Sequence, residues 1–148
     1  MLGCHDQPQT LAGQIEQLKR QVNADAQALR DLEENDYPQL RSDFRHCDSL
    51  MQYMDSAQVC AAFEQLNLVQ AYLNQFVEVK AEMKQKMDYS LVQLEHLKAD
   101  AESHFISDSL ASAYLEIETL VADTLHHRLL YFQDRFGQCR TELAALKK

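Results

Sequence analysis

The 148 residues suffice for one domain, and with 3 Gly and 2 Pro the chain can build few tight turns. The formal net charge of -9 argues against nucleic acid as a partner, because phosphate binding depends on clustered Lys and Arg. No apolar run is long enough to predict a membrane-spanning helix, and no segment keeps the two-residue alternation that is typical of a half-buried strand.

The first residues contain a short feature that bears on targeting. Met1-Leu2-Gly3-Cys4 is followed by a polar stretch at residues 5–9. These residues resemble the end of a bacterial lipoprotein signal peptide, in which a small residue stands directly before the cysteine that is lipidated after cleavage. The resemblance implies a lipid anchor at Cys4, a flexible tether over residues 1–9 and a periplasm-facing place in the cell envelope. The sequence departs from that pattern because no charged segment and no full apolar segment stand before Gly3. The alternative is a frayed tail with an ordinary cysteine.

The first predicted helix begins at Thr10, which is suited to an N-cap. Apolar residues then recur at steps of three and four, with a polar Asp25 in the same register, as in a coiled-coil seam. They are Leu11, Ile15, Leu18, Val22, Leu29 and Leu32. Pro38 predicts a kink or a short break, after which the stripe resumes from Leu40 to Met54.

Two further arms are predicted, over residues 56–101 and 108–147, with cap signals at Asp55-Ser56 and Ser107-Asp108. The predicted stripe of the second arm is Val59, Phe63, Leu66, Leu73, Val77, Met87, Leu91 and Leu94. The predicted stripe of the third arm is Leu110, Tyr114, Ile117, Val121, Leu125, Phe132, Phe136, Cys139, Leu143 and Leu146.

These patterns together predict an all-α fold, an antiparallel bundle of long amphipathic helices packed like a coiled coil. Three arms (10–54, 56–101 and 108–147) are expected, or four helices if the break at Pro38 is a true turn. The bundle forms a single domain over residues 10–148, after the tether at 1–9.

No constellation in the sequence predicts catalysis, a cofactor or a metal. The Glu-x-x-His pairs of di-iron bundles do not occur, and the nearest approximations are Asp43/His46 and Asp123/His126. The helical angles of Asp123, His126 and His127 place them opposite the predicted core stripe, on the solvent side. A non-enzymatic protein is therefore predicted.

Cys47 and Cys60 are candidates for a disulfide. They stand at similar distances on either side of the predicted turn at 54–56, so an antiparallel hairpin would bring them close to each other. The alternative is that both are reduced core cysteines.

Leu68, Leu115 and Leu130 fall outside the predicted core stripes and are candidates for a partner or self-association surface. The alternative is burial of a central helix on several sides. Two functions remain open: a lipid-anchored spacer or protein-binding module of the bacterial envelope, and a cytoplasmic coiled-coil protein that homo-oligomerises or binds a partner helix. No small-molecule substrate is evident.

Overall fold

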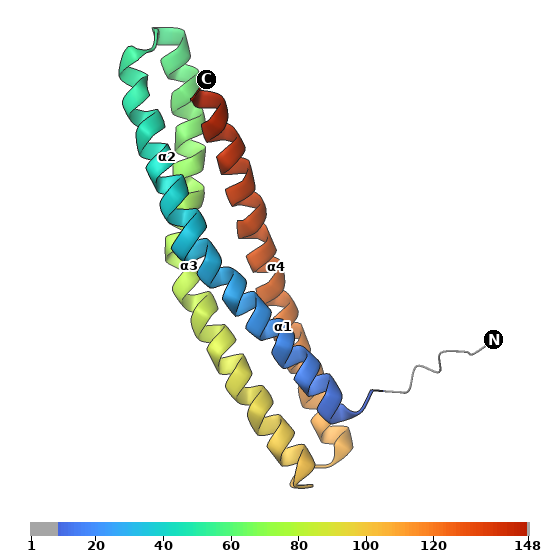
Figure 1. Cartoon of the computed structure of the whole chain (residues 1–148). Coiled ribbons are helices and arrows are strands. Elements are labelled where there is room, and N and C mark those ends of the chain that lie inside the picture. Colours follow the sequence, from blue (N-terminus) through green and yellow to red (C-terminus); the bar gives the residue numbers. More distant parts are fainter. Residues whose placement is uncertain (1–8, 148) are drawn as a thin grey trace, which may run out of the picture.

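The computed structural model describes residues 9–147, and all regular elements within them are helical. Three arms lie side by side, each antiparallel to the next in the chain (Figure 1). The first arm is α1 (Leu11–Asp31), a π-helical turn (Leu32–Asp36) and α2 (Tyr37–Leu50); the second is α3 (Ser56–Glu102) and the third is α4 (Asp108–Leu146). The predicted all-α bundle is confirmed. It has three arms, because no turn separates α1 from α2. None of the helices in this described range is both long and apolar enough to cross a bilayer.

Each arm begins at a side-chain cap. Thr10, Asp55 and Ser107 each accept a hydrogen bond from the backbone N–H three residues on, at 3.1, 2.8 and 3.1 Å. The Gln58 side chain in turn accepts the backbone N–H of Asp55 at 3.1 Å, which completes a capping box. These bonds satisfy N–H groups that have no partner inside the helix, so they fix where each arm starts.

The α3 helix ends in a left-handed residue that is not glycine. His104 has φ 56°, and the N–H of Phe105 donates to the carbonyl of Asp100 at 3.0 Å while that of His104 donates to Ala101 at 3.3 Å. This pair of bonds is a Schellman motif, which favours glycine at the left-handed position because a Cβ there approaches the backbone. The turn sends the chain back along the bundle as α4.

The left-handed backbone of His104 leads to one stability prediction. Replacing His104 by glycine is expected to raise the free energy of unfolding by about 0.5–1 kcal/mol, because glycine adopts positive φ without the steric cost of a Cβ. Urea denaturation of the variant against the parent measures this difference. Ser103→Gly is the matched control: Ser103 has φ -82°, so glycine relieves nothing there and should lower stability.

The first arm passes Pro38 without a break. A proline ring clashes with the carbonyl four residues earlier in a regular α-helix, but here Tyr37 donates its N–H to Leu32, five residues back. The wider turn also accommodates one extra residue between the buried Leu32 and Leu40, which are eight positions apart rather than seven. The π-helical turn therefore keeps both leucines in the core, and the predicted interruption is a local widening of one continuous helix.

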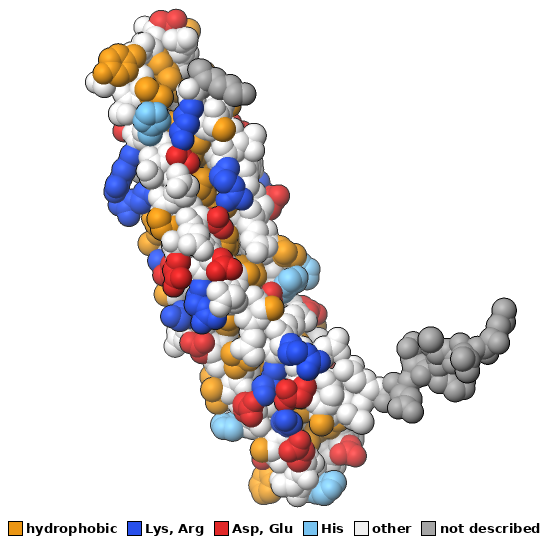
Figure 2. Space-filling model, in the orientation of Figure 1, with side chains coloured by type: hydrophobic (Ala, Val, Ile, Leu, Met, Phe, Trp, Pro, Cys, Tyr) orange, Lys and Arg blue, Asp and Glu red, His pale blue; other side chains and the backbone are white. Residues whose placement is uncertain are grey.

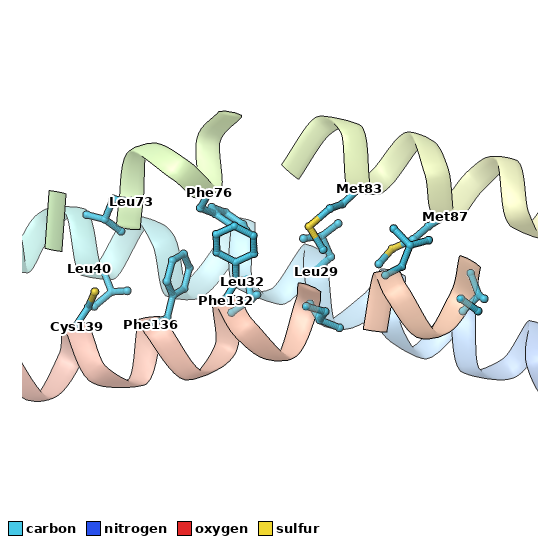
Figure 3. Close-up of a cluster of buried hydrophobic side chains, with 14 of the residues drawn as sticks. Leu29, Leu32, Leu40, Leu73, Phe76, Met83, Met87, Phe132, Phe136 and Cys139 are labelled. Atoms are coloured by element: carbon cyan, nitrogen blue, oxygen red, sulfur yellow. The ribbon is translucent and has the colours of Figure 1, made fainter. Parts of the chain in front are cut away.

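The core of the bundle is richest in aromatic residues where α2, α3 and α4 meet. Phe76 is fully buried, and its ring centroid lies 5.3 Å from that of Phe132 and 4.9 Å from that of Phe136, both in edge-on contact. Tyr37 adds a tilted contact at 5.8 Å. Figure 3 shows the rings of Phe76, Phe132 and Phe136 close together, with Leu40, Leu73 and Cys139 on one side and Leu29, Met83 and Met87 on the other. Edge-to-face contacts stabilise beyond simple burial, so this cluster is expected to dominate the packing.

The buried seam of α3 differs from the predicted stripe. It follows steps of four and three residues, with one step of seven after Phe76, through Ala62, Leu66, Val69, Leu73, Phe76, Met83, Met87, Ser90, Leu94 and Leu97. Phe63 and Val77, which were predicted to be in the core, are 56% and 44% exposed. The two stripes share Leu66, Leu73, Met87 and Leu94, and the bundle buries the one that carries Phe76.

The face of the bundle seen in Figure 2 is polar. Lys and Arg stand beside Asp and Glu along it, and ion pairs link α1 or the π-helical turn to α3. Lys98 lies 2.8 Å from Glu16 and Lys80 lies 2.9 Å from Glu33. Solvent-exposed pairs of this kind contribute little to stability. Their charges make this face polar.

Candidate interaction surface

An apolar stripe is exposed on the half of the bundle next to the α3–α4 loop. Leu110, Tyr114, Ile117 and Val121 of α4 are 42%, 48%, 56% and 39% exposed, and Tyr89 of α3 is 65% exposed. We call these five residues the α3–α4 stripe. Contiguous exposed apolar surface of this kind marks interaction sites more often than scattered single residues do.

The spacing of the stripe on α4 is that of a helix-packing seam. Its four members recur at steps of four, three and four, which keeps them on one side of the helix. They were predicted to face the core, and the structure corrects this. The buried seam of the same stretch contains Ala111, Leu115 and Ala122, each of which directly follows a stripe residue in the sequence. Two of these three buried residues are alanines, whereas all four residues of the stripe on α4 are larger than alanine and lie outside.

Two adjoining hollows run between α3 and α4 along the stripe. The hollow towards the middle of the bundle has a volume of about 290 Å³ and includes Tyr89 and Val121 in its walls. The hollow next to the loop has a volume of about 420 Å³ and includes Tyr114 and the 81% exposed Phe105. The surface is thus a shallow groove with aromatic walls, which suits an apolar side chain of a partner helix.

The two ends of the groove differ in charge. Lys86 and Arg128 stand at the end towards the middle of the bundle, where Glu82 lies 2.6 Å from Lys86 and 3.8 Å from Arg128. Asp100 lines the end next to the loop, and Asp108 occupies the first turn of α4 there. A partner with the reverse order of charges would therefore be favoured.

The other half of the α3–α4 groove is covered by the chain itself. The Arg135 guanidinium lies over the rings of Tyr72 and Tyr131, 5.2 and 5.1 Å from their centroids, and donates to Gln138 at 2.9 Å. Tyr131 donates to Gln75 across the groove at 3.2 Å. Cation–π stacking of this kind holds the long side chain over the groove, so the groove is closed in this half.

A carboxylate lies under the stripe. Glu118 occupies a buried-seam position of α4 and accepts a hydrogen bond from the hydroxyl of the buried Ser90 at 3.4 Å. Partial burial raises the pKa of Glu118 above its ordinary value, and the Ser90 hydrogen bond offsets part of that rise. Ionised Glu118 therefore costs stability, because the folded bundle favours its neutral form.

Glu118→Gln is expected to flatten the dependence of stability on pH. The raised pKa means that the contribution of Glu118 to stability is largest below the ordinary value of 4.5 and is lost as pH rises through the folded-state pKa. The amide has no charge to desolvate, so the variant should lose less stability between pH 4.5 and pH 7. Urea midpoints at the two pH values measure this, with the exposed Glu116→Gln as the control. Equal pH slopes for wild type and Glu118→Gln would contradict the assignment.

A second polar contact joins the first and third arms. Asp25 is 7% exposed at a core-seam position of α1, and its two carboxylate oxygens lie 2.9 and 3.1 Å from Nδ1 of His126. The structure corrects the prediction for His126, which turns towards α1 rather than directly into solvent. His127 instead lies with its Nδ1 2.7 Å from the carbonyl of Asp123 on its own helix.

The three leucines predicted to form a partner surface have different environments. Leu68 and Leu130 are 41% and 44% exposed, whereas Leu115 is 7% exposed and belongs to the core. Leu115 was predicted to be exposed because the stripe beside it looked like the core seam. Neither Leu68 nor Leu130 lines the two hollows of the α3–α4 groove, so the structure does not bring these leucines together.

The predicted Cys47–Cys60 disulfide is absent. Cys47 is buried on α2, where its Sγ lies 3.5 Å from the carbonyl of Leu143, while Cys60 is an exposed free thiol on α3. The two positions flank the α2–α3 turn as expected, but Cys47 faces α4. Cys139 is also free and buried, and burial raises its pKa to about 11.

The cysteine environments predict an ordered pattern of alkylation. Cys60 is expected to react at the rate of an exposed thiol at pH 8, whereas Cys139 should react at least about 100-fold more slowly, because a pKa near 11 leaves little thiolate. Cys47 should be protected in the same way by burial. Peptide mapping after timed iodoacetamide exposure identifies each site. Rapid labelling of Cys139 in the folded protein would contradict the packing described above.

Cys4, the predicted lipidation site, lies outside the described residues. Within residues 9–147, no group of three or more His, Cys, Asp or Glu side chains is placed to hold a metal ion. In comparisons with known proteins, no family model, no curated protein and no solved structure matches the chain.

Proposed function

We propose that this chain is a non-enzymatic helical-bundle protein that binds a protein partner through the α3–α4 stripe. One observation carries the proposal: the half of α4 next to the loop exposes four large apolar residues at helix-packing spacing, while two of its buried positions are alanines. A monomer that served only as a spacer would gain stability by burying Ile117 and Tyr114 in place of Ala111 and Ala122.

The proposal includes a lipid anchor at Cys4, which rests on Gly3-Cys4 alone. The five residues between Cys4 and Thr10 span at most about 20 Å, so an anchor would hold the membrane near the start of α1. In Figure 1 this start lies at the same end of the rod as the α3–α4 loop. An anchor at Cys4 and the α3–α4 stripe would therefore belong to the same half of the bundle.

A photo-crosslinking amino acid at position 117 tests the binding proposal in cells that produce the chain at its native level. We expect a discrete covalent adduct of defined mass from position 117, and its loss when Val121→Glu is added. The matched control is position 130, because Leu130 is similarly exposed on the same helix but does not belong to the α3–α4 stripe. Equal adduct patterns at the two positions, or none at 117, would overturn the proposal.

The intact mass of the protein tests the anchor separately. A chain that begins at Cys4 with added acyl mass supports the envelope assignment. A chain without lipid at Cys4 overturns it and favours the cytoplasmic alternative, while the binding proposal is judged by the crosslinks alone.

A further inference from the structure

We propose that the partner at the α3–α4 stripe is a second copy of this chain, packed antiparallel about a two-fold axis. This inference rests on the proposed function, because it names the occupant of the same surface. The stripe with Phe105 and Val92 exposes on the order of 800 Å², which is close to what each partner contributes to a standard protein interface. A second copy would therefore bury enough surface for a stable dimer.

A two-fold axis perpendicular to the helices places each helix against its own copy, running in the opposite direction. Residues equally far from the axis on either side then meet. If the axis passes Ile117, that residue contacts Ile117 of the second copy, Leu110 contacts its Thr124, and Tyr114 contacts its Leu120, next to Val121. The same seam is thus complementary to itself, as in an antiparallel coiled coil.

The charges on α3 fit the same axis independently. Lys86 and Asp100 lie seven residues to either side of Gln93, which lines the groove at the level of the axis. Each Lys86 therefore meets an Asp100 of the second copy. The Gln93 amide has both a donor and an acceptor, so the two copies can hydrogen-bond to each other at the centre.

A parallel pairing is disfavoured by the same residues. An axis along the rod would stack α3 of one copy on α4 of the other without inverting them. Lys86 of α3 and Arg128 of α4 line the same hollow at one end of the stripe, so they would face each other across the interface. Like charges in contact destabilise an interface, whereas the antiparallel pairing separates them.

Cysteine crosslinking tests the axis directly. In a chain with Cys4 and Cys60 replaced by serine, Ile117→Cys is expected to form a disulfide-linked species of twice 17.1 kDa, because a residue on the axis meets its copy within disulfide range. Leu110→Cys alone should give little, but a mixture of Leu110→Cys and Thr124→Cys chains should give the crosslinked heterodimer. Leu130→Cys is the matched control and should stay monomeric under denaturing conditions. Efficient crosslinking of Leu130→Cys, or none of Ile117→Cys, would overturn the antiparallel dimer.

Sedimentation equilibrium tests the energetics. Ile117→Glu places two carboxylates at the axis, so we expect at least a 100-fold rise in the dissociation constant with no loss of helical circular dichroism. Lys86→Glu should weaken the dimer, and adding Asp100→Lys should restore it, because the pair is exchanged across the axis. A wild-type chain that sediments as a 17.1 kDa monomer at about 100 μM overturns the inference.

The two proposals fail in different ways. A monomeric wild type that still gives a discrete adduct from position 117, of a mass that is not twice that of the chain, overturns the second copy and leaves the binding surface supported. An adduct of twice the chain mass supports both.

Discussion

Replacing Phe76 by alanine is expected to lower the free energy of unfolding by about 3–5 kcal/mol, the largest effect of any single substitution that we predict. Phe76 is fully buried at the junction of three helices, and its ring is in edge-on contact with Phe132 and Phe136. Alanine would remove these contacts and leave a cavity that the rigid helices on either side cannot fill. Urea denaturation followed by circular dichroism measures the difference.

Phe63→Ala on the same helix is the matched control. Its side chain is 56% exposed, so the substitution removes little buried surface and alanine is the better helix former. We expect a change within about 0.5 kcal/mol. Similar losses for Phe63→Ala and Phe76→Ala would mean that the apolar stripe first expected from the sequence, and not the seam in the structure, forms the core of α3.

The arms of the bundle follow from strong local signals. Thr10, Asp55 and Ser107 are good capping residues directly before long apolar repeats, so the start of each helix could be read from the sequence. Pro38 misled, because proline alone predicts a break. The spacing of eight residues between Leu32 and Leu40 indicates a continuous helix with one wide turn. This spacing can be interpreted only when both leucines are known to be buried.

The inner and outer faces of α4 could not be assigned from the sequence. The loop-side half of this helix carries two seams one position apart, and the outer seam has the larger apolar residues. Pattern reading assigns the larger residues to the core, which is why Leu115 was placed outside. Only the approach of α1 and α3 decides which seam is covered, and that is a property of the whole bundle. The wrong assignment and the candidate interaction surface therefore have the same cause.

Contacts between distant residues were also beyond the sequence. Asp25 and His126 are 101 positions apart, and no spacing rule relates them. Cys47 and Cys60 were correctly placed on either side of one turn, yet the side-chain direction of Cys47 depends on how α2 rotates against α4. The rotation of a helix about its own axis is set by tertiary packing. A heptad repeat identifies the apolar side of the helix, but it does not fix which residues at the edge of that side are buried.

The Asp25–His126 contact predicts a non-additive pair of substitutions. His126→Ala is expected to lower the free energy of unfolding by about 1–3 kcal/mol, because the Asp25 carboxylate stays almost buried and loses its partner. Asp25→Leu in the same background is expected to recover this loss, because leucine continues the apolar seam of α1. A double-mutant cycle from urea denaturation at pH 7 gives the coupling free energy.

Asp25→Leu alone distinguishes two roles of the Asp25–His126 contact: it either stabilises the fold directly or fixes the register of the helices against each other. Apolar replacement of buried ionic groups is often neutral or stabilising, and the His126 side chain is 38% exposed and can be solvated, so we expect no loss of stability. A polar residue in a coiled-coil seam instead fixes register, because any shifted arrangement leaves it buried without its partner. If Asp25 acts in this way, Asp25→Leu should keep or raise the urea midpoint while lowering the m-value, as less uniquely packed bundles do. A large loss of stability with an unchanged m-value would show that the carboxylate stabilises the fold directly.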